Sequence, residues 1–290
     1  MANIYTGQVQ GLCKCTGTTT AGSLTAFCRK VSGGTFNRNP NNIRNVGIGA
    51  QLQVLKGIDE ITLDWRCVGP AKTDVALWFP TAAGVTVGSF PNFLVEVDDG
   101  SNGQELVLYN GQPATCTIAW TENGQVEYTF SAKFASVTEI AAGTNTPVYN
   151  SYRGHQYTAV AYNSTAKGTQ SWTLSNDLGC TMFNTADTKS ADSRTLPAGY
   201  VVTTQSPRFQ AVVTDEHLIN DMDGDNWTSE DTTIALANGV TAEDCTITLH
   251  DFVPSSFSMP LEAEGIVGFG IALEPGGETT TTLYNRVTFA

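Results

Sequence analysis

The segment at residues 110–118 (NGQPATCTI) returns in altered form at residues 238–247 (NGVTAEDCTI). The cysteines of the two copies, Cys116 and Cys245, lie 129 residues apart (245 − 116). An Asn-Gly pair favours a tight turn, and the Cys-Thr-Ile run after it is typical of a β-strand. A chain that contains one such unit twice is constrained to fold into two related parts.

Two further pairs of segments match upstream: residues 23–27 with 171–175, and 61–65 with 209–213, both at an offset of 148. The offset then changes by 19 residues (148 − 129), which one length change in a surface loop would produce, because loop closure costs grow slowly with length. We therefore predict an N-terminal arm at 1–20, a first domain at 21–142, a junction at 143–153 and a second domain at 154–290. Chance similarity among β-strand patterns is the alternative explanation.

Residue content favours strands over helices. Hydrophobic residues make up 41% of the chain and charged residues 15%, and 28 glycines separate short apolar runs, so we expect a mostly β fold. The expected architecture is two tandem β-sandwich or barrel domains, each with one short flanking α-helix, at 73–79 and 214–220. Residues 36–44 are expected to form a loop, Gly57 a turn, and 98–103 a hairpin turn.

The formal net charge is −13, from 28 acidic and 15 basic residues, and no run of Lys or Arg occurs. Binding to nucleic acid that is independent of base sequence comes from basic residues that neutralise phosphates. We therefore expect no tight binding to DNA or RNA. The first twelve residues lack the basic flank and apolar core of a signal peptide, and no apolar run is long enough to span a bilayer. We expect a protein made in a cytoplasm, with no membrane partner.

Seven cysteines are spread thinly along the chain. Cys28, Cys67, Cys116 and Cys245 sit singly in strand-like segments, where a reduced thiol behaves as a small buried hydrophobe, so we expect free thiols rather than a disulfide framework. The Cys13-x-Cys15 pair resembles half of a metal site, but no second pair at ligand spacing accompanies it.

Candidate chemistry is sparse. The three histidines, His155, His217 and His250, lie in no recognisable catalytic motif, so we predict no enzyme and no catalytic, cofactor-binding or metal-binding residues. The acidic run from Asp221 to Asp225 could wrap a hard cation, but Asn226 and Thr232 occupy the positions where a helix-loop-helix calcium site needs Gly and Glu. A solvated acidic loop is the alternative for this run, and whether it binds a cation stays open.

The order of features resembles the tail tube (major tail) proteins of long-tailed bacteriophages. In the second half the resemblance lies in residues 170–176 (QSWTLSN), two strands across 196–214, the helix from Asp215 and the Asn-Gly turn before Cys245. In the first half it lies in residues 108–116 and 128–134. Together these patterns span about four fifths of the chain, and they are strand and turn patterns rather than a signature of conserved chemistry.

The resemblance implies a virion structural protein whose inner sheet joins its neighbours into a continuous β-lined tube. Single-domain members of the family form hexameric rings, so a doubled chain implies a trimer with pseudo-sixfold symmetry, stacked into a tail tube that also contacts other tail proteins. Viral DNA would pass through an acidic lumen without specific binding, since like charges repel. The expected location is the virion tail, assembled in the host cytoplasm, and no cofactor is implied.

Two other functions stay open. One is a different virion subunit, a tail terminator or a decoration protein, which would use the same fold. The other is a carbohydrate-binding β-sandwich module, which would use exposed aromatic side chains. Trp78, Trp120, Trp172 and Trp227 are the candidates, although the first three lie on patterned elements that favour a core role.

Overall fold

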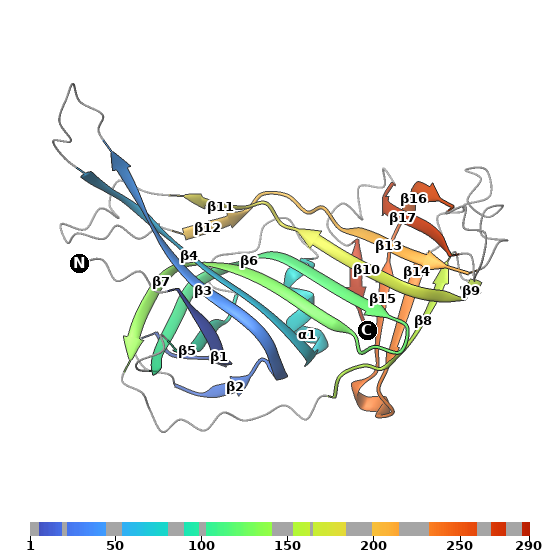
Figure 1. Cartoon of the computed structure of the whole chain (residues 1–290), viewed down its shortest axis with the longest axis horizontal. Helices are drawn as coiled ribbons and strands as arrows, with labels where there is room; N and C mark the ends of the chain where they lie inside the picture. The colour runs from blue at the N-terminus through green and yellow to red at the C-terminus, as the bar shows by residue number, and fades with distance from the viewer. Residues whose placement is uncertain are drawn as a thin grey trace.

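The computed structural model describes residues 6–18, 22–44, 54–80, 90–98, 103–140, 153–162, 165–183, 199–214, 232–259, 268–276 and 286–290. This part of the chain is mostly β, as the sequence predicts, and its strands pair antiparallel (Figure 1). They build a closed barrel from the first half and a two-layer sandwich from the second.

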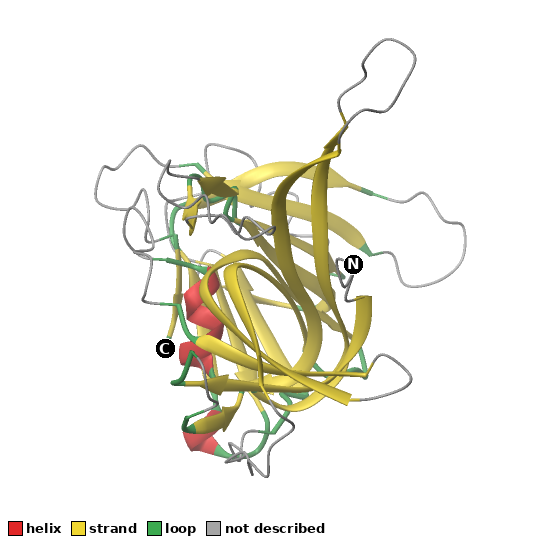
Figure 2. Cartoon of the chain, turned by 90° about the vertical axis from the view of Figure 1, so that its left-hand side faces the viewer, coloured by secondary structure: helices red, strands yellow, loops and turns green. Residues whose placement is uncertain are grey.

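The barrel contains six strands, each paired with two others. They are β1 (Thr6–Cys15), β3 (Cys28–Arg44), β4 (Val54–Pro70), β5 (Asn92–Asp98), β6 (Gly103–Thr121) and β7 (Glu127–Ile140). The order β6-β5-β1-β3-β4-β7 closes because β7 also pairs with β6, and the short β2 (Leu24–Ala26) adds to β1. Figure 2 looks into this ring of strands.

Aromatic side chains fill the barrel. Trp65, Phe27 and Phe130 contact one another at centroid distances of 5.3 Å. The short helix α1 (Lys72–Val75) and the 3₁₀ turn η1 (Ala76–Trp78) place Trp78 in the same cluster, 4.6 Å from Phe130, where its Nε1 donates to the Ser131 carbonyl at 2.9 Å. The helix predicted at 73–79 is therefore confirmed, and it serves to bury a tryptophan.

The second half is a sandwich. One layer contains β10 (Thr169–Asp177), β13 (Arg208–Val213), β17 (Phe269–Pro275) and β16 (Phe252–Ser258). The other contains β9 (Thr165–Lys167), β8 (Tyr157–Tyr162), β14 (Thr232–Ala237), β15 (Cys245–Leu249) and β18 (Val287–Phe289), with the 3₁₀ turn η3 (Thr241–Glu243) before β15. A separate hairpin consists of β11 (Cys180–Phe183) and β12 (Gly199–Val202).

The two halves share one sheet and one core. Strand β10 pairs with β6 over seven residue pairs, from Ser171 opposite Thr121 to Asp177 opposite Thr115. Buried side chains of both halves belong to a single hydrophobic cluster, which reaches from Phe36 in the barrel to Leu273 in the sandwich. The boundary between the halves is therefore packed and hydrogen-bonded.

Both halves repeat one order of strand pairing. In the first half β5 lies between β1 and β6, and β4 lies between β3 and β7. In the second half β14 lies between β8 and β15, and β13 lies between β10 and β17. The first half closes into a barrel because β1 pairs with β3 and β6 with β7, whereas the second stays open as two layers.

The individual sequence matches fit this order less well. Residues 61–65 and 209–213 lie in β4 and β13, which occupy corresponding places. Residues 23–27, however, contain β2, whereas 171–175 belong to β10, whose place corresponds to β3. Cys116 lies opposite Phe130 and Asn176, while Cys245 lies opposite Leu236, so the two cysteines have unlike neighbours.

Several local expectations are wrong. The predicted arm at 1–20 contains β1, which pairs with β5 from Gln8 to Cys15. The predicted loop at 36–44 is the end of β3, paired with β4. Gly57 is no turn but lies inside β4 where the register with β3 shifts, as glycines at β-bulges do.

The first Asn-Gly pair is also not a turn. Asn110 lies inside β6 with φ 54°, in the left-handed region. The second pair does form a turn between β14 and β15, with Gly239 at φ 84°. The strands around the turn predicted at 98–103 pair as a hairpin, Asp98 opposite Gly103.

Some predicted features lie outside the described residues. These are most of the junction at 143–153, the second helix at 214–220 apart from its first residue, the acidic run from Asp221 to Asp225, His217 and Trp227.

Candidate functional site

One broad surface combines both halves: the outward face of the layer formed by β6, β10, β13, β17 and β16. Burial alternates along β10 and β13, so that every second side chain of these two strands faces away from the core. The outward residues lie in register across the strands, as in the row Ala119, Thr173, Gln210, Ala272 and Ser256.

The outward face is built of small and hydroxyl-bearing side chains. By their register, the residues on this side of the strands are Thr117, Ala119, Thr121, Ser171, Thr173, Ser175, Arg208, Gln210, Val212, Gly270, Ala272, Glu274, Val253, Ser256 and Ser258, of which Ala272 is buried. Arg208 and Glu274 form an ion pair at 3.2 Å, so their charges offset each other. An open hollow of ≈ 310 Å³ lies over β10, β13, β17 and β16. This hydroxyl-rich face offers many weak hydrogen-bonding groups and no unpaired cation among these side chains.

Strand β16 is an open edge of this layer. It pairs with β17 on one side only, among the described residues. Val253 and Phe257 on it and Met259 just beyond it are 37%, 38% and 50% exposed, which makes three of the five exposed large hydrophobic side chains of the described structure. An unpaired edge that carries apolar side chains is a surface on which another strand can pair.

The hairpin of β3 and β4 also has open outer edges. Within the described part of the chain, β3 beyond Asn37 pairs only with β4, and β4 before Ile61 pairs only with β3. Figure 1 shows this two-stranded ribbon extending past the barrel. A lone hairpin is marginally stable in water, so contact with other strands would stabilise the ribbon.

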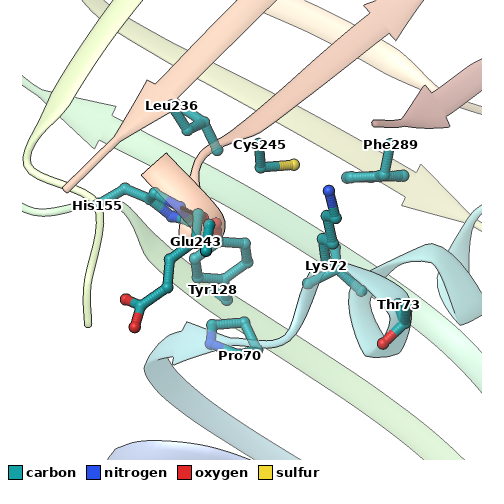
Figure 3. A pocket seen from close by; sticks show the side chains of 11 residues that line it. Pro70, Lys72, Thr73, Tyr128, His155, Leu236, Glu243, Cys245 and Phe289 are labelled. Atoms are coloured by element: carbon teal, nitrogen blue, oxygen red, sulfur yellow. Dashed lines mark hydrogen bonds between the residues drawn. The ribbon is translucent and has the colours of Figure 1, made fainter. Parts of the chain in front are cut away.

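A small cavity of ≈ 70 Å³ lies at the joint between the halves (Figure 3). Lys72 and Tyr128 line it from the first half, and His155, Glu243 and Cys245 from the second. Figure 3 shows the Lys72 side chain directed between Cys245 and Phe289.

His155 joins the two halves at this cavity. It is buried, its Nε2 lies 3.0 Å from the Glu243 carbonyl oxygen, and its Nδ1 lies 3.4 Å from the Tyr128 hydroxyl. A carbonyl only accepts, so Nε2 carries the proton, and in the neutral ring Nδ1 accepts from Tyr128. The His155 carbonyl in turn accepts from the Val126 amide at 2.9 Å. The Nε2 bond to Glu243 fixes the ring within the second half, and the Nδ1 bond to Tyr128 and the backbone bond from Val126 join that half to the first.

Three other groups at the joint, Cys245, Tyr128 and Glu243, have shifted pKa values. Burial raises the pKa of the Cys245 thiol to about 11, with Lys72 opposing the shift, so the thiol is protonated at neutral pH. Burial also raises the pKa of Tyr128 well above its usual range. The Arg153 amide, which donates to the Glu243 carboxylate at 2.8 Å, lowers the pKa of Glu243.

The remaining candidates occupy structural positions. All seven cysteines are free thiols, and Cys13 and Cys15 lie in β1, with pKa values raised by burial to about 11. His250 contacts the Thr288 hydroxyl at 2.9 Å through Nε2. Trp78 and Trp172 are buried in the core, and Trp120 is half-buried against it. Within the described ranges, no three His, Cys, Asp or Glu side chains come together as a metal site.

No protein-family model matches this chain, and no curated protein matches it. In the part of the chain that the structure describes, no helix has the length and apolarity needed to cross a bilayer.

The sequence pointed to some of these residues but not to their setting. It singled out His155 as one of three histidines, yet Tyr128 and Glu243 carried no signal, because their proximity to His155 depends on contacts across 27 and 88 residues. The sequence did not predict the hydroxyl-rich face, because the face is continuous only through the pairing of β6 with β10.

Proposed function

We propose that this chain is a virion structural protein that forms stacked rings, the tail tube through which viral DNA passes. The observation that carries the proposal is the unbroken sheet through both halves, with a hydroxyl-rich face on one side and an open apolar edge at β16. A sheet with these properties is suited to continue into a neighbouring copy and form a wall.

The hydroxyl-rich face suits a lumen. Small side chains leave the surface smooth, and the Arg208–Glu274 pair leaves no free cation between them to hold a phosphate. With a net charge of −13, the chain as a whole repels a DNA duplex. Weak, repulsive contact lets the duplex slide.

The ring is proposed to be a trimer. The repeated order of strand pairing supports a duplicated tail-tube unit, with each half supplying one sixth of the circle. The unpaired edge of β16 and the ribbon of β3 and β4 would contact neighbouring copies, because such edges are tolerated in water only when covered. In the virion tail, the same rings would meet other tail proteins at the ends of the tube.

Electron microscopy of the purified protein, with analytical ultracentrifugation, tests this proposal. We expect stacked rings with three chains per ring and apparent sixfold symmetry. Discrete rings that never stack would instead indicate a terminator, and a monomer at every concentration would refute assembly altogether.

A matched pair of variants tests the role of β16. Val253→Asp places a charge on the open edge, whereas Val201→Asp makes the same change at a residue of β12 with nearly the same exposure, 39% against 37%. We expect Val253→Asp to reduce tube formation at least tenfold at equal concentration and Val201→Asp to leave it unchanged. Equal effects of the two changes would argue against β16 as the contact.

A further inference from the structure

A second surface, distinct from the hydroxyl-rich face, lies where the turn between β6 and β7 meets the start of β8. It is an open groove of ≈ 550 Å³, within the usual size of small-ligand sites. Trp120, Glu122, Asn123 and Gln125 line it from the first half, and Gln156 and Tyr157 from the second.

Hydrogen bonds fix both walls of the groove. The Glu122 amide donates to the Gln170 carbonyl at 2.8 Å, and the Gly124 amide to the Thr121 carbonyl at 2.9 Å. On the other wall, the Gln156 amide donates to the Ala237 carbonyl at 3.2 Å. The Val126–His155 bond ties the walls together, so the groove exists in the free protein and a ligand would not need to order it.

The lining combines aromatic rings with side chains that both donate and accept hydrogen bonds. Tyr157 is the most exposed large hydrophobic side chain of the described structure, at 67%. Asn123, Gln125 and Gln156 each carry an amide that donates and accepts, and Glu122 accepts through two oxygens. Among the described residues that line the groove there is no Lys or Arg, which disfavours a phosphate-bearing ligand.

One polar atom at the groove has no partner among the described residues. The indole Nε1 of Trp120 is buried and makes no hydrogen bond. A buried donor without a partner costs free energy. Because this nitrogen is shielded from solvent, other atoms of the Trp120 indole ring line the groove.

We propose that this groove binds a saccharide. A pyranose ring has an apolar C–H face, which packs on an aromatic ring, and a rim of hydroxyls that both donate and accept. The groove presents both kinds of group, and it is polar rather than apolar, which fits a sugar better than a hydrophobic peptide. Residues of both halves form the site. The proposal does not depend on whether the chain forms a tail tube.

The test is a glycan array probed with the whole protein, followed by calorimetric titration of the strongest glycan found on the array, and of chitohexaose, cellohexaose and maltohexaose. We expect saturable binding of at least one glycan. Tyr157→Ala should weaken its Kd about tenfold and Gln156→Ala about fivefold. Tyr157 is largely exposed, so its replacement leaves the fold intact, which circular dichroism checks.

Phe257→Ala is the control, because it removes an exposed aromatic side chain on β16, away from the groove. It should bind the glycan as the natural sequence does. Absence of binding to every glycan, or equal loss with Phe257→Ala and Tyr157→Ala, would overturn the proposal. So would displacement of the glycan from the groove by unrelated peptides, which would make it a peptide site.

Discussion

Lys14 and Asp74 form an ion pair that ties β1 to α1. The Lys14 Nζ lies 2.7 Å from both carboxylate oxygens, and Asp74 is buried. Burial raises the pKa of Asp74 above its usual value, and the hydrogen bond from Lys14 opposes that rise. A buried carboxylate that loses its cationic partner costs far more free energy than an exposed one does.

Lys14→Met should therefore destabilise the protein by about 3 kcal/mol at pH 7. The raised pKa means that the folded state binds the Asp74 proton more tightly than the unfolded state does. Stability from this group is thus greatest below the unfolded pKa near 3.8 and falls as pH rises through the folded pKa. Without Lys14 the pKa rises further, so the fall should extend toward neutral pH. Urea unfolding between pH 4 and pH 7 measures it.

Lys133→Met is the matched control. Lys133 pairs with Glu60 at 2.7 Å, but the Glu60 side chain is 41% exposed, so the loss should stay below about 1 kcal/mol. If Lys14→Met cost the same at pH 4 and pH 7, lost packing of the lysine stem would explain the effect better than a stranded carboxylate.

At the scale of elements, β6 pairs with two different neighbours along its length. Before Asn110 strand β6 pairs with β5, and after it with β10. Gly111 follows because a side chain there would collide with the buried ring of Phe134. Asn110 thus adopts the left-handed backbone conformation, and Gly111 allows the Phe134 ring to approach the backbone closely.

Asn110→Val should lower the free energy of unfolding by about 1–2 kcal/mol, because β-branched residues resist the left-handed region. Asn110→Gly should stay within about 0.5 kcal/mol of the natural sequence, since glycine adopts this conformation freely. Thermal and urea unfolding distinguish them, and equal losses would mean that the Asn110 side chain matters rather than its φ.

The sequence predicted a turn at the first Asn-Gly pair, and the structure has instead a left-handed residue inside a strand. Asn-Gly indicates a positive φ, and whether the chain reverses or merely bends there depends on β5 and β10, which are distant in sequence. In the same way, residues 36–44 look like a loop because they are polar and contain Pro40, yet β4 pairs with them. The helix at 73–79 was predictable because its signals, an N-cap before apolar residues and a following Pro80, are local.

At the scale of the whole molecule, the halves should unfold together. One hydrophobic cluster and one ladder cross the boundary, so neither half keeps its core when the other unfolds. Calorimetry of the unassembled Val253→Asp protein should give one transition, with equal van't Hoff and calorimetric enthalpies.

Leu174→Ala on β10 provides the accompanying test. This fully buried side chain lies in the ladder, so its loss should cost about 2–5 kcal/mol and lower the single transition by several degrees. A transition that splits in two would show that the halves are independent.

The β6–β10 ladder also has a mechanical consequence. Its seven residue pairs lie side by side, so a force that slides one half along the other loads their hydrogen bonds in parallel, and they resist together. A flexible linker would take up the same force by bending. Each chain should therefore resist deformation at the boundary between its halves. If such chains form a filament, the filament should bend at the contacts between subunits.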